Sequence, residues 1–156
     1  MSASTSRVQK ALTAAGLEAR VVELPQSTRT AADAAKAIGC QVGQIAKSLV
    51  FRASESGSAV LVIASGTNRV NEATIAAEIG EPIGKADADF VRARSGYAIG
   101  GVPPVGHATP MRTFIDEDLL RFDRIWAAAG TPNAVFELSP AAELQRITGG
   151  AVIRVS

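Results

Sequence analysis

Two apolar segments, residues 48–52 and 59–65, are separated by little more than the turn-forming residues 55–58. Apolar runs of this length, bounded by Gly and Ser, are typical of two strands joined as a hairpin. Segments with a helical spacing of apolar residues stand on both sides of this pair. The alternation of short strands with short helices predicts an α/β or α+β fold.

The helical segments carry start and stop signals. Thr30, followed by Asp33, is a capping-box-like start, and Asn71 can cap another helix. Pro140 suits a first helical turn, and glycine follows several of the helical patterns as a stop. We expect helices over residues 5–15, 30–39, 71–80 and 87–94, and a last helix that begins near residue 140.

The expected strands differ in length. They cover residues 20–24, 48–52, 59–65, 112–115, 124–128, 135–138 and 151–155. Several unequal strands and few long helices predict a single domain over residues 1–156, with a mixed α/β architecture in which short helices surround a curved, barrel-like sheet. A doubly wound nucleotide-binding fold fits less well, because no phosphate-binding fingerprint follows the first strand.

Composition restricts the partners and the compartment. The net charge is only +1, so any contact with RNA should be local rather than broadly electrostatic. Cys40 is the only cysteine, which excludes an internal disulfide and fits a reducing compartment. The longest apolar run, residues 59–64, is too short to span a membrane, and the N-terminal segment does not resemble a signal peptide. We expect a cytoplasmic protein with neither a membrane nor a DNA partner.

The available side chains disfavour several kinds of catalytic and metal site. The only histidine is His107, and the chain has no Gly-x-Ser-x-Gly sequence that would supply a nucleophilic serine for a catalytic triad. We therefore expect His107 to be an exposed loop residue and not a triad base. Cys40 follows a helix-ending glycine and is better interpreted as buried and inert than as a nucleophile. One Cys and one His are too few ligands for a structural zinc site, and no P-loop sequence is present. No metal and no cofactor are expected.

Lys47 stands among apolar residues. If residues 44–51 are extended, Ile45, Lys47, Leu49 and Phe51 share one face of the strand. Burying an ammonium group without a partner is costly. Lys47 must therefore reach solvent, pair with a carboxylate, or line a pocket in which it meets a ligand.

A second feature is the glycine- and proline-rich segment 100–104. Paired glycines allow the backbone of Gly100 and Gly101 to approach a ligand closely, and the prolines stiffen the loop. Free N–H groups on such a loop are suited to stabilising a developing oxyanion. An ordinary tight connection between two elements has the same composition.

With these two features the chain resembles the YbaK/EbsC family, relatives of the editing domain inserted in bacterial prolyl-tRNA synthetases. The matching segments follow one another in the family's order. They are the first conserved helix at 30–39, the lysine strand at 44–51, the next strand at 60–66, the glycine–proline loop at 95–106, and shorter matches at 128–132 and 147–150. Together the matching segments cover about residues 5–155.

The resemblance implies a YbaK-like barrel-like sheet with a pocket near Lys47. It implies hydrolysis of the ester that joins a non-cognate amino acid to the 3′ acceptor end of tRNA, and a synthetase is a possible partner. The family's lysine corresponds to Lys47, and its loop glycine and proline correspond to Gly100, Gly101 and Pro104. We expect catalytic roles for Lys47, Gly100 and Gly101.

The neighbouring residues Ser48, Val102 and Pro104 are the expected substrate-binding residues. Tyr97 and His107 are weaker candidates for the lining of the site. Family members that remove cysteine carry a tyrosine in the early strand, whereas residues 21–24 here contain none. The amino acid removed is therefore left open among small residues such as Cys, Ala and Ser.

Other functions fit the same residues. A non-catalytic module could hold tRNA or a synthetase on the same fold, and a hydrolase could act on another small ester or amide. An RNA surface would need basic residues, and we name Arg69, Lys85, Arg92 and Arg94 as candidates. The same four side chains are equally compatible with an ordinary solvated surface.

Overall fold

The computed structural model describes all residues 1–156. Its helices are α1 (Ala3–Ala14), α2 (Ala31–Ile38), α3 (Glu72–Ile79), α4 (Ala88–Ser95) and α5 (Gln145–Thr148), with short helical turns η1 (Val42–Gln44), η2 (Glu117–Arg121) and η3 (Pro140–Leu144). Its strands are β1 (Val22–Glu23), β2 (Ile45–Ala53), β3 (Ala59–Ser65), β4 (Ile83–Lys85), β5 (Arg112–Asp116), β6 (Ile125–Ala128), β7 (Ala134–Leu138) and β8 (Ala151–Ile153).

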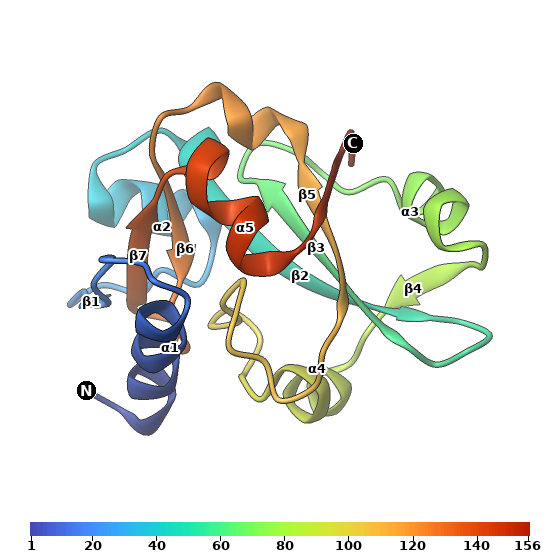
Figure 1. The fold of residues 1–156 in the computed structure, drawn as a ribbon, viewed down its shortest axis with the longest axis horizontal. Coiled ribbons are helices and arrows are strands. Elements are labelled where there is room, and N and C mark those ends of the chain that lie inside the picture. The colour runs from blue at the N-terminus through green and yellow to red at the C-terminus, as the bar shows by residue number, and fades with distance from the viewer.

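All eight strands belong to one mixed sheet in the order β1-β7-β6-β2-β3-β5-β8, with β4 paired to β2 outside this path. The β2–β3 hairpin is antiparallel, whereas β2 runs parallel to β6 and β3 runs parallel to β5. In Figure 1 this long hairpin crosses the molecule, with β6, β7, α1 and α2 on one side of it and β4 and α3 on the other. The predicted mixed α/β architecture with short helices is confirmed.

Local signals set the helix boundaries. The side chains of Thr30, Asn71 and Asp87 each accept a hydrogen bond from a backbone N–H in the first turn of α2, α3 and α4. A glycine in the left-handed region ends each of these helices, since glycine has no Cβ to clash there. The predicted helices over 30–39, 71–80 and 87–94 therefore match the structure closely.

Apolar side chains pack on both faces of the β2–β3 hairpin. On one face, Leu61 and Ile63 belong to the larger core, which α1, β6 and β7 complete. On the other face, Val62 and Ala64 pack with Phe51 against α3 and β4. Because successive side chains of a strand point to opposite faces, β3 is buried along its whole length.

Three expectations about elements need correction. The strand expected over residues 20–24 is reduced to Val22–Glu23, which pairs only with β7. The strand expected over residues 48–52 begins earlier, at Ile45, because β6 pairs with its first residues. The three-residue strand β4 was not expected, since its strand conformation depends on long-range pairing with β2.

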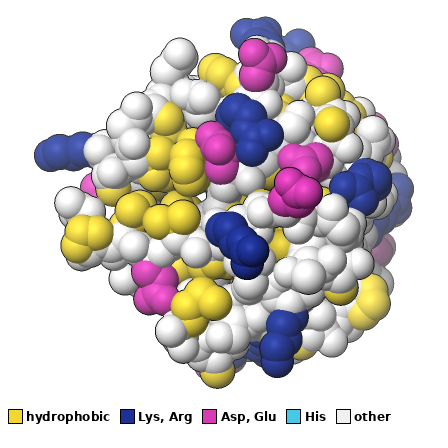
Figure 2. Space-filling view, turned by 60° about the vertical axis from the view of Figure 1, so that its left-hand side comes forward, with side chains coloured by type: hydrophobic (Ala, Val, Ile, Leu, Met, Phe, Trp, Pro, Cys, Tyr) yellow, Lys and Arg dark blue, Asp and Glu magenta, His cyan; other side chains and the backbone are white.

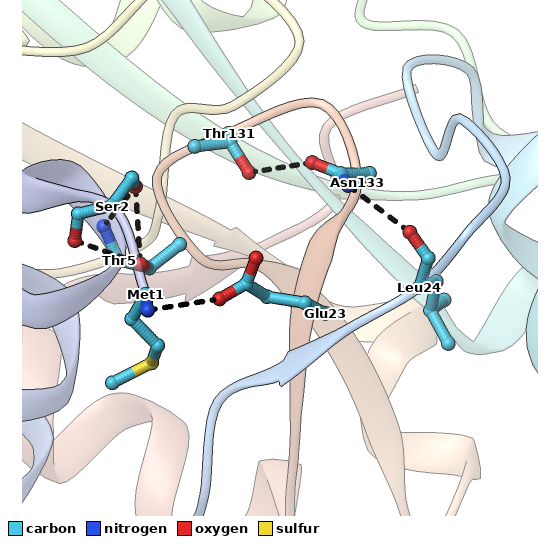
Figure 3. A network of polar contacts seen from close by, with 7 residues as sticks. All are labelled: Met1, Ser2, Thr5, Glu23, Leu24, Thr131 and Asn133. Atoms are coloured by element: carbon cyan, nitrogen blue, oxygen red, sulfur yellow. Dashed lines mark hydrogen bonds and ion pairs between the residues drawn. The ribbon is translucent and has the colours of Figure 1, made fainter.

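The N-terminus, β1 and the turn that precedes β7 lie against one another. The N-terminal ammonium group lies 3.8 Å from a carboxylate oxygen of Glu23, and the Asn133 side chain donates to the Leu24 carbonyl at 3.0 Å (Figure 3). At the adjacent Gly130, an added Cβ would lie 2.9 Å from the carbonyl oxygen of Ser4 in α1. The start of α1 therefore packs directly on this turn.

On the face drawn in Figure 2, cationic and acidic side chains are interspersed, and apolar atoms lie between them. This pattern agrees with the small net charge of +1. None of the helices has the length and apolar character that crossing a membrane requires.

Candidate active site

A cavity with a volume of about 700 Å³ is formed mainly along β2. Sixteen of its 25 lining residues are hydrophobic, so the cavity suits a ligand with a small apolar part. Its walls come from β2, the end of β6, the start of α2 and the segment around residues 99–102. The lining includes Lys47, Ser48, Gly100 and Val102, four of the residues expected at the site.

The cavity lies at a gap in the sheet. On the edge of β2 that faces away from β3, β6 pairs only with Ile45 and Ala46, and β4 pairs only with the stretch from Phe51 to Ala53. Residues 47–50 therefore have no neighbouring strand on that edge, and all four line the cavity. Since side chains alternate along a strand, Lys47 points to one face of the sheet and Ser48 to the other.

Lys47 is held by a chain of hydrogen bonds that ends in two carboxylates. Its Nζ donates to the backbone carbonyl of Asn68 at 2.8 Å. The Asn68 side-chain amide donates to Asp116 Oδ2 at 2.8 Å and to Asp118 Oδ2 at 2.7 Å. Asp116 is buried and also accepts from the backbone N–H of Ser65 at 2.9 Å. Of the three surroundings considered for Lys47, the structure shows the third, because Lys47 lines a cavity. Its hydrogen-bond partner is a backbone carbonyl and not a carboxylate.

Burial lowers the pKa of Lys47 below that of an ordinary lysine, and the nearby charge of Asp116 opposes this shift. No carboxylate lies within ion-pair distance of the ammonium group. The ammonium has three protons to donate, and one is used by Asn68. The others are available to an acceptor on a ligand.

The glycine–proline loop faces the same cavity, but its two glycines differ in what they offer. The N–H groups of Gly100 and Val102 donate no hydrogen bond within the chain, and both residues line the cavity. The N–H of Gly101 donates to the Ala98 carbonyl at 3.0 Å, so it is not free to bind an oxyanion. The expected pair of donors, Gly100 and Gly101, is thus replaced by Gly100 and Val102.

Gly101 instead allows a close approach between two backbones. Its carbonyl accepts from the N–H of Gly130 at 2.9 Å. A Cβ at residue 101 would lie 2.9 Å from backbone atoms of both Gly130 and Thr131. Gly101 therefore joins the loop to the turn before β7, on which α1 rests.

Tyr97 and His107 hold the ends of the loop. The buried Tyr97 donates from its hydroxyl to the Gly106 carbonyl at 2.8 Å, and the guanidinium of Arg7 lies 4.5 Å from its ring centre. His107 Nε2 lies 2.7 Å from the carbonyl oxygen of Pro103, so its N–H donates there. Burial lowers the pKa of His107. The exposed loop histidine expected from the sequence is thus a half-buried residue that braces the loop.

The remaining expected residues lie outside the cavity wall. Pro104 is buried in the loop but does not line the cavity, and neither do Tyr97 and His107. Cys40, expected to be buried, is partly exposed and packs beside α2, and burial raises the pKa of its thiol. No group of three or more His, Cys, Asp or Glu side chains is placed to hold a metal ion.

Three exposed cationic residues stand among the lining residues of the cavity: Arg29, Arg69 and Lys85. None of them forms an ion pair within the chain. Arg94, another residue expected to meet RNA, is occupied by the Phe90 ring and the Gly57 carbonyl, and Arg92 lies away from the cavity. Arg29 was missed from the sequence because only the fold brings the segment before α2 to the cavity.

This geometry can be compared with known proteins. Residues 25–146 match the family described as the aminoacyl-tRNA editing domain, and this stretch contains every lining residue of the cavity. The chain belongs to the aminoacyl-tRNA editing domain family. The EbsC protein of Enterococcus faecalis, named as a candidate Cys-tRNA(Pro)/Cys-tRNA(Cys) deacylase, is 27% identical over 121 residues, which are 77% of this chain and 73% of EbsC. The resemblance to YbaK/EbsC proteins is therefore confirmed.

Two further relatives of this editing domain are more similar in sequence. The uncharacterized protein YwhH of Bacillus subtilis is 32% identical over 120 residues, which are 77% of this chain and 76% of YwhH. A solved structure named as a candidate trans-editing enzyme for prolyl tRNA synthetase is 48% identical, covers 100% of this chain and 98% of its own, and superposes with a TM-score of 0.93. The YbaK-like fold is thus shared over the whole chain.

Proposed function

We propose that this editing domain is an aminoacyl-tRNA deacylase that hydrolyses the ester of a mischarged tRNA in trans. The expected substrate carries a small amino acid, and tRNA for proline is the expected carrier. The observation that supports this proposal most directly is the cavity wall shared by Lys47 and the free N–H groups of Gly100 and Val102. The names of EbsC and of the candidate trans-editing enzyme point to the same substrate class.

The chemistry requires few protein groups, because an aminoacyl ester is already activated. A water molecule adds to the ester carbonyl carbon, and the resulting oxyanion accepts hydrogen bonds from the N–H groups of Gly100 and Val102. The carbon–oxygen bond to the terminal ribose then breaks, and the proton lost by the water passes to the departing ribose oxygen. Lys47 holds the ester or the terminal nucleotide through its ammonium protons.

The charges around the cavity agree with a nucleic-acid end as ligand. Arg29, Arg69 and Lys85 are free to meet the phosphates of an acceptor strand, while the apolar wall receives the amino acid. A pocket separates side chains that differ by one methylene by only about 1–3 kcal/mol, so several small amino acids are expected to be accepted to different degrees.

The test is a deacylation assay with a panel of tRNAs charged with Ala, Cys, Ser, Thr and Pro. We expect one or two of these esters to be lost far faster than in buffer alone, and we expect Lys47→Ala to abolish the acceleration. Lys36→Ala, which removes an exposed lysine of α2, is the matched control and should behave as wild type.

Retention of every ester by folded wild-type protein would contradict the proposal. Filter binding of the same charged tRNAs would then test the alternative of a non-catalytic module. Hydrolysis of simple amino acid esters without any acceleration on tRNA would instead indicate a hydrolase of small esters.

A further inference from the structure

The edge of β2 that faces away from β3 directs backbone groups to the cavity, and two hydrogen bonds fix which residues supply them. Ala53 donates to the Ser58 carbonyl of the hairpin at 2.8 Å, whereas Ser54 donates to the Pro82 carbonyl, just before β4, at 2.8 Å. In an antiparallel pair, hydrogen bonds to one partner strand alternate along the chain. Odd-numbered residues of β2 therefore bond to β3, and even-numbered residues turn their N–H and C=O groups to the opposite edge.

Three of the groups on this edge have no partner in the chain. The pairing with β6 ends at Ala46, and the pairing with β4 begins at Phe51. No loop residue bonds to the N–H or C=O of Ser48 or to the N–H of Val50, and both residues line the cavity. Along the edge these groups stand in the order donor, acceptor, donor. Since backbone groups withdrawn from bulk water are nearly always paired, this row points to a ligand.

The gap in the sheet suits a compact group and not a further strand. β6 and β4 occupy this edge of β2 on either side of the gap, so a polypeptide running along the edge would displace one of them. Ala46 and Phe51 are five residues apart, which is about 16 Å at the rise of a β-strand. A planar ring system that lies in the plane of the sheet fits such a gap.

Apolar side chains from both faces of the sheet line the cavity. Val91 and Val102 belong to the larger core on one face, whereas Leu49 and Val70 pack with the cluster on the other face. The cavity therefore reaches both faces, so a flat ring in the gap would find apolar contacts above and below it. The volume of about 700 Å³ is that of a pocket for a whole small-molecule ligand, and it exceeds the needs of a small amino acid side chain.

Adenine carries the groups that this edge lacks. On its Watson–Crick side, the N6 amino group is a donor and the neighbouring ring nitrogen N1 is an acceptor. A carbonyl and the N–H two residues later on the same strand edge are the complementary pair. Guanine and uracil present the opposite polarity, a carbonyl oxygen beside a ring N–H. The nucleotide that bears the ester at the 3′ end of a tRNA is adenosine.

We propose that the open edge of β2 binds the adenine of the 3′-terminal adenosine, with the N6 amino group donating to the Ser48 carbonyl and the Val50 N–H donating to N1. This inference rests on the proposed deacylase function and names a part of the tRNA that the cavity recognises besides the amino acid. The competing arrangement uses the other side of the base, with N7 accepting from the N–H of Ser48.

The experiment changes the base, because no side-chain substitution removes a backbone group. Wild-type protein is given an aminoacyl-tRNA that it deacylates, and the same aminoacyl-tRNA with 1-deazaadenosine, purine riboside, inosine or 7-deazaadenosine as its terminal nucleoside. The first lacks N1, the second lacks the amino group, and inosine reverses the polarity of both positions. 7-Deazaadenosine is the matched control, because N7 takes no part in the proposed contacts. Each rate is divided by the rate of spontaneous hydrolysis of that ester.

We expect kcat/KM to fall about 10-fold for the 1-deazaadenosine and purine riboside ends, because each loses one hydrogen bond and leaves a backbone group unpaired. Inosine loses both contacts and should lower kcat/KM about 100-fold. The 7-deazaadenosine end should react as the natural end does.

Equal normalised rates on all five ends would overturn this inference while leaving the deacylase function intact. A loss with 7-deazaadenosine but not with 1-deazaadenosine would overturn it in favour of the arrangement through N7. Failure of wild type on the natural adenosine end, with every amino acid of the panel, would instead contradict the proposed function itself. All arms use the wild-type chain, so none depends on whether a variant folds.

Discussion

The Lys47 ammonium group donates its 2.8 Å hydrogen bond to the backbone carbonyl of Asn68, not to a carboxylate. The carboxylates of Asp116 and Asp118 form no ion pair with this ammonium group; they accept hydrogen bonds from the Asn68 side chain and so position it. This arrangement positions the cation without neutralising it in an ion pair. A positioned and unneutralised ammonium group is what a site for an ester or a phosphate requires.

Replacing Lys47 should therefore abolish catalysis and leave the fold intact. We expect Lys47→Ala to lower kcat about 100- to 1,000-fold, as observed when one electrostatic contact to a transition state is removed. Lys47→Arg should recover little, because the planar guanidinium cannot adopt the same geometry at Asn68. Single-turnover deacylation with each variant gives the rate, and a wild-type rate in Lys47→Ala would exclude a catalytic role.

Removing the carboxylate that holds Asn68 should cost stability. Asp116 is buried and accepts hydrogen bonds from Ser65, Asn68 and the Asp118 backbone. In Asp116→Asn, an amide N–H₂ group replaces one of the two oxygens that accept these hydrogen bonds, so two donors face each other in a buried place. We expect the free energy of unfolding to fall by about 2–4 kcal/mol. Urea unfolding measures this loss. The exposed Asp123→Asn is the control, and equal stabilities of the two variants would contradict the network described for Asp116.

A methyl group at Gly101 should displace the loop from the cavity. The added Cβ would lie 2.9 Å from backbone atoms of Gly130 and Thr131, which cannot rotate away. We expect Gly101→Ala to lower the free energy of unfolding by about 1–3 kcal/mol and to slow deacylation. In Gly84→Ala the new methyl group meets open space, so thermal unfolding and activity should stay near wild type.

The cations at the cavity should govern the response of tRNA binding to salt. We expect Arg29→Gln, Arg69→Gln and Lys85→Gln each to raise KM. Each should also make the plot of the logarithm of the tRNA association constant against the logarithm of the salt concentration less steep, by about 0.7. Arg92→Gln, at an exposed arginine away from the cavity, is the matched control. Unchanged slopes in the three variants would show that the phosphates lie elsewhere.

His107 should make the fold sensitive to mild acid. Burial lowers its pKa below the ordinary value of 6.5, so at lower pH the unfolded chain binds a proton that the folded chain resists. Stability from this group is present above pH 6.5 and declines as the pH falls toward the folded pKa, by at most about 1.4 kcal/mol per pH unit. Urea unfolding at several pH values should show a smaller acid loss in His107→Gln than in wild type. Parallel pH profiles for both proteins would contradict this assignment.

The chain's local signals determined much of the fold. Thr30, Asn71 and Asp87 cap their helices because a side-chain oxygen reaches an N–H two or three residues along the chain. Lys47 was identified because an ammonium group among apolar neighbours requires an explanation whatever the fold is. The ordered motifs were enough to predict the family.

Tertiary structure alone decided which groups remain free at the cavity. The N–H of Gly101 is used and those of Gly100 and Val102 are not, because the loop closes on Ala98 and docks on Gly130. The open edge at Ser48 exists because β6 and β4 each stop pairing with β2 before they reach it. Such differences arise from strand register and backbone contacts between distant segments, and neither residue type nor local spacing encodes them.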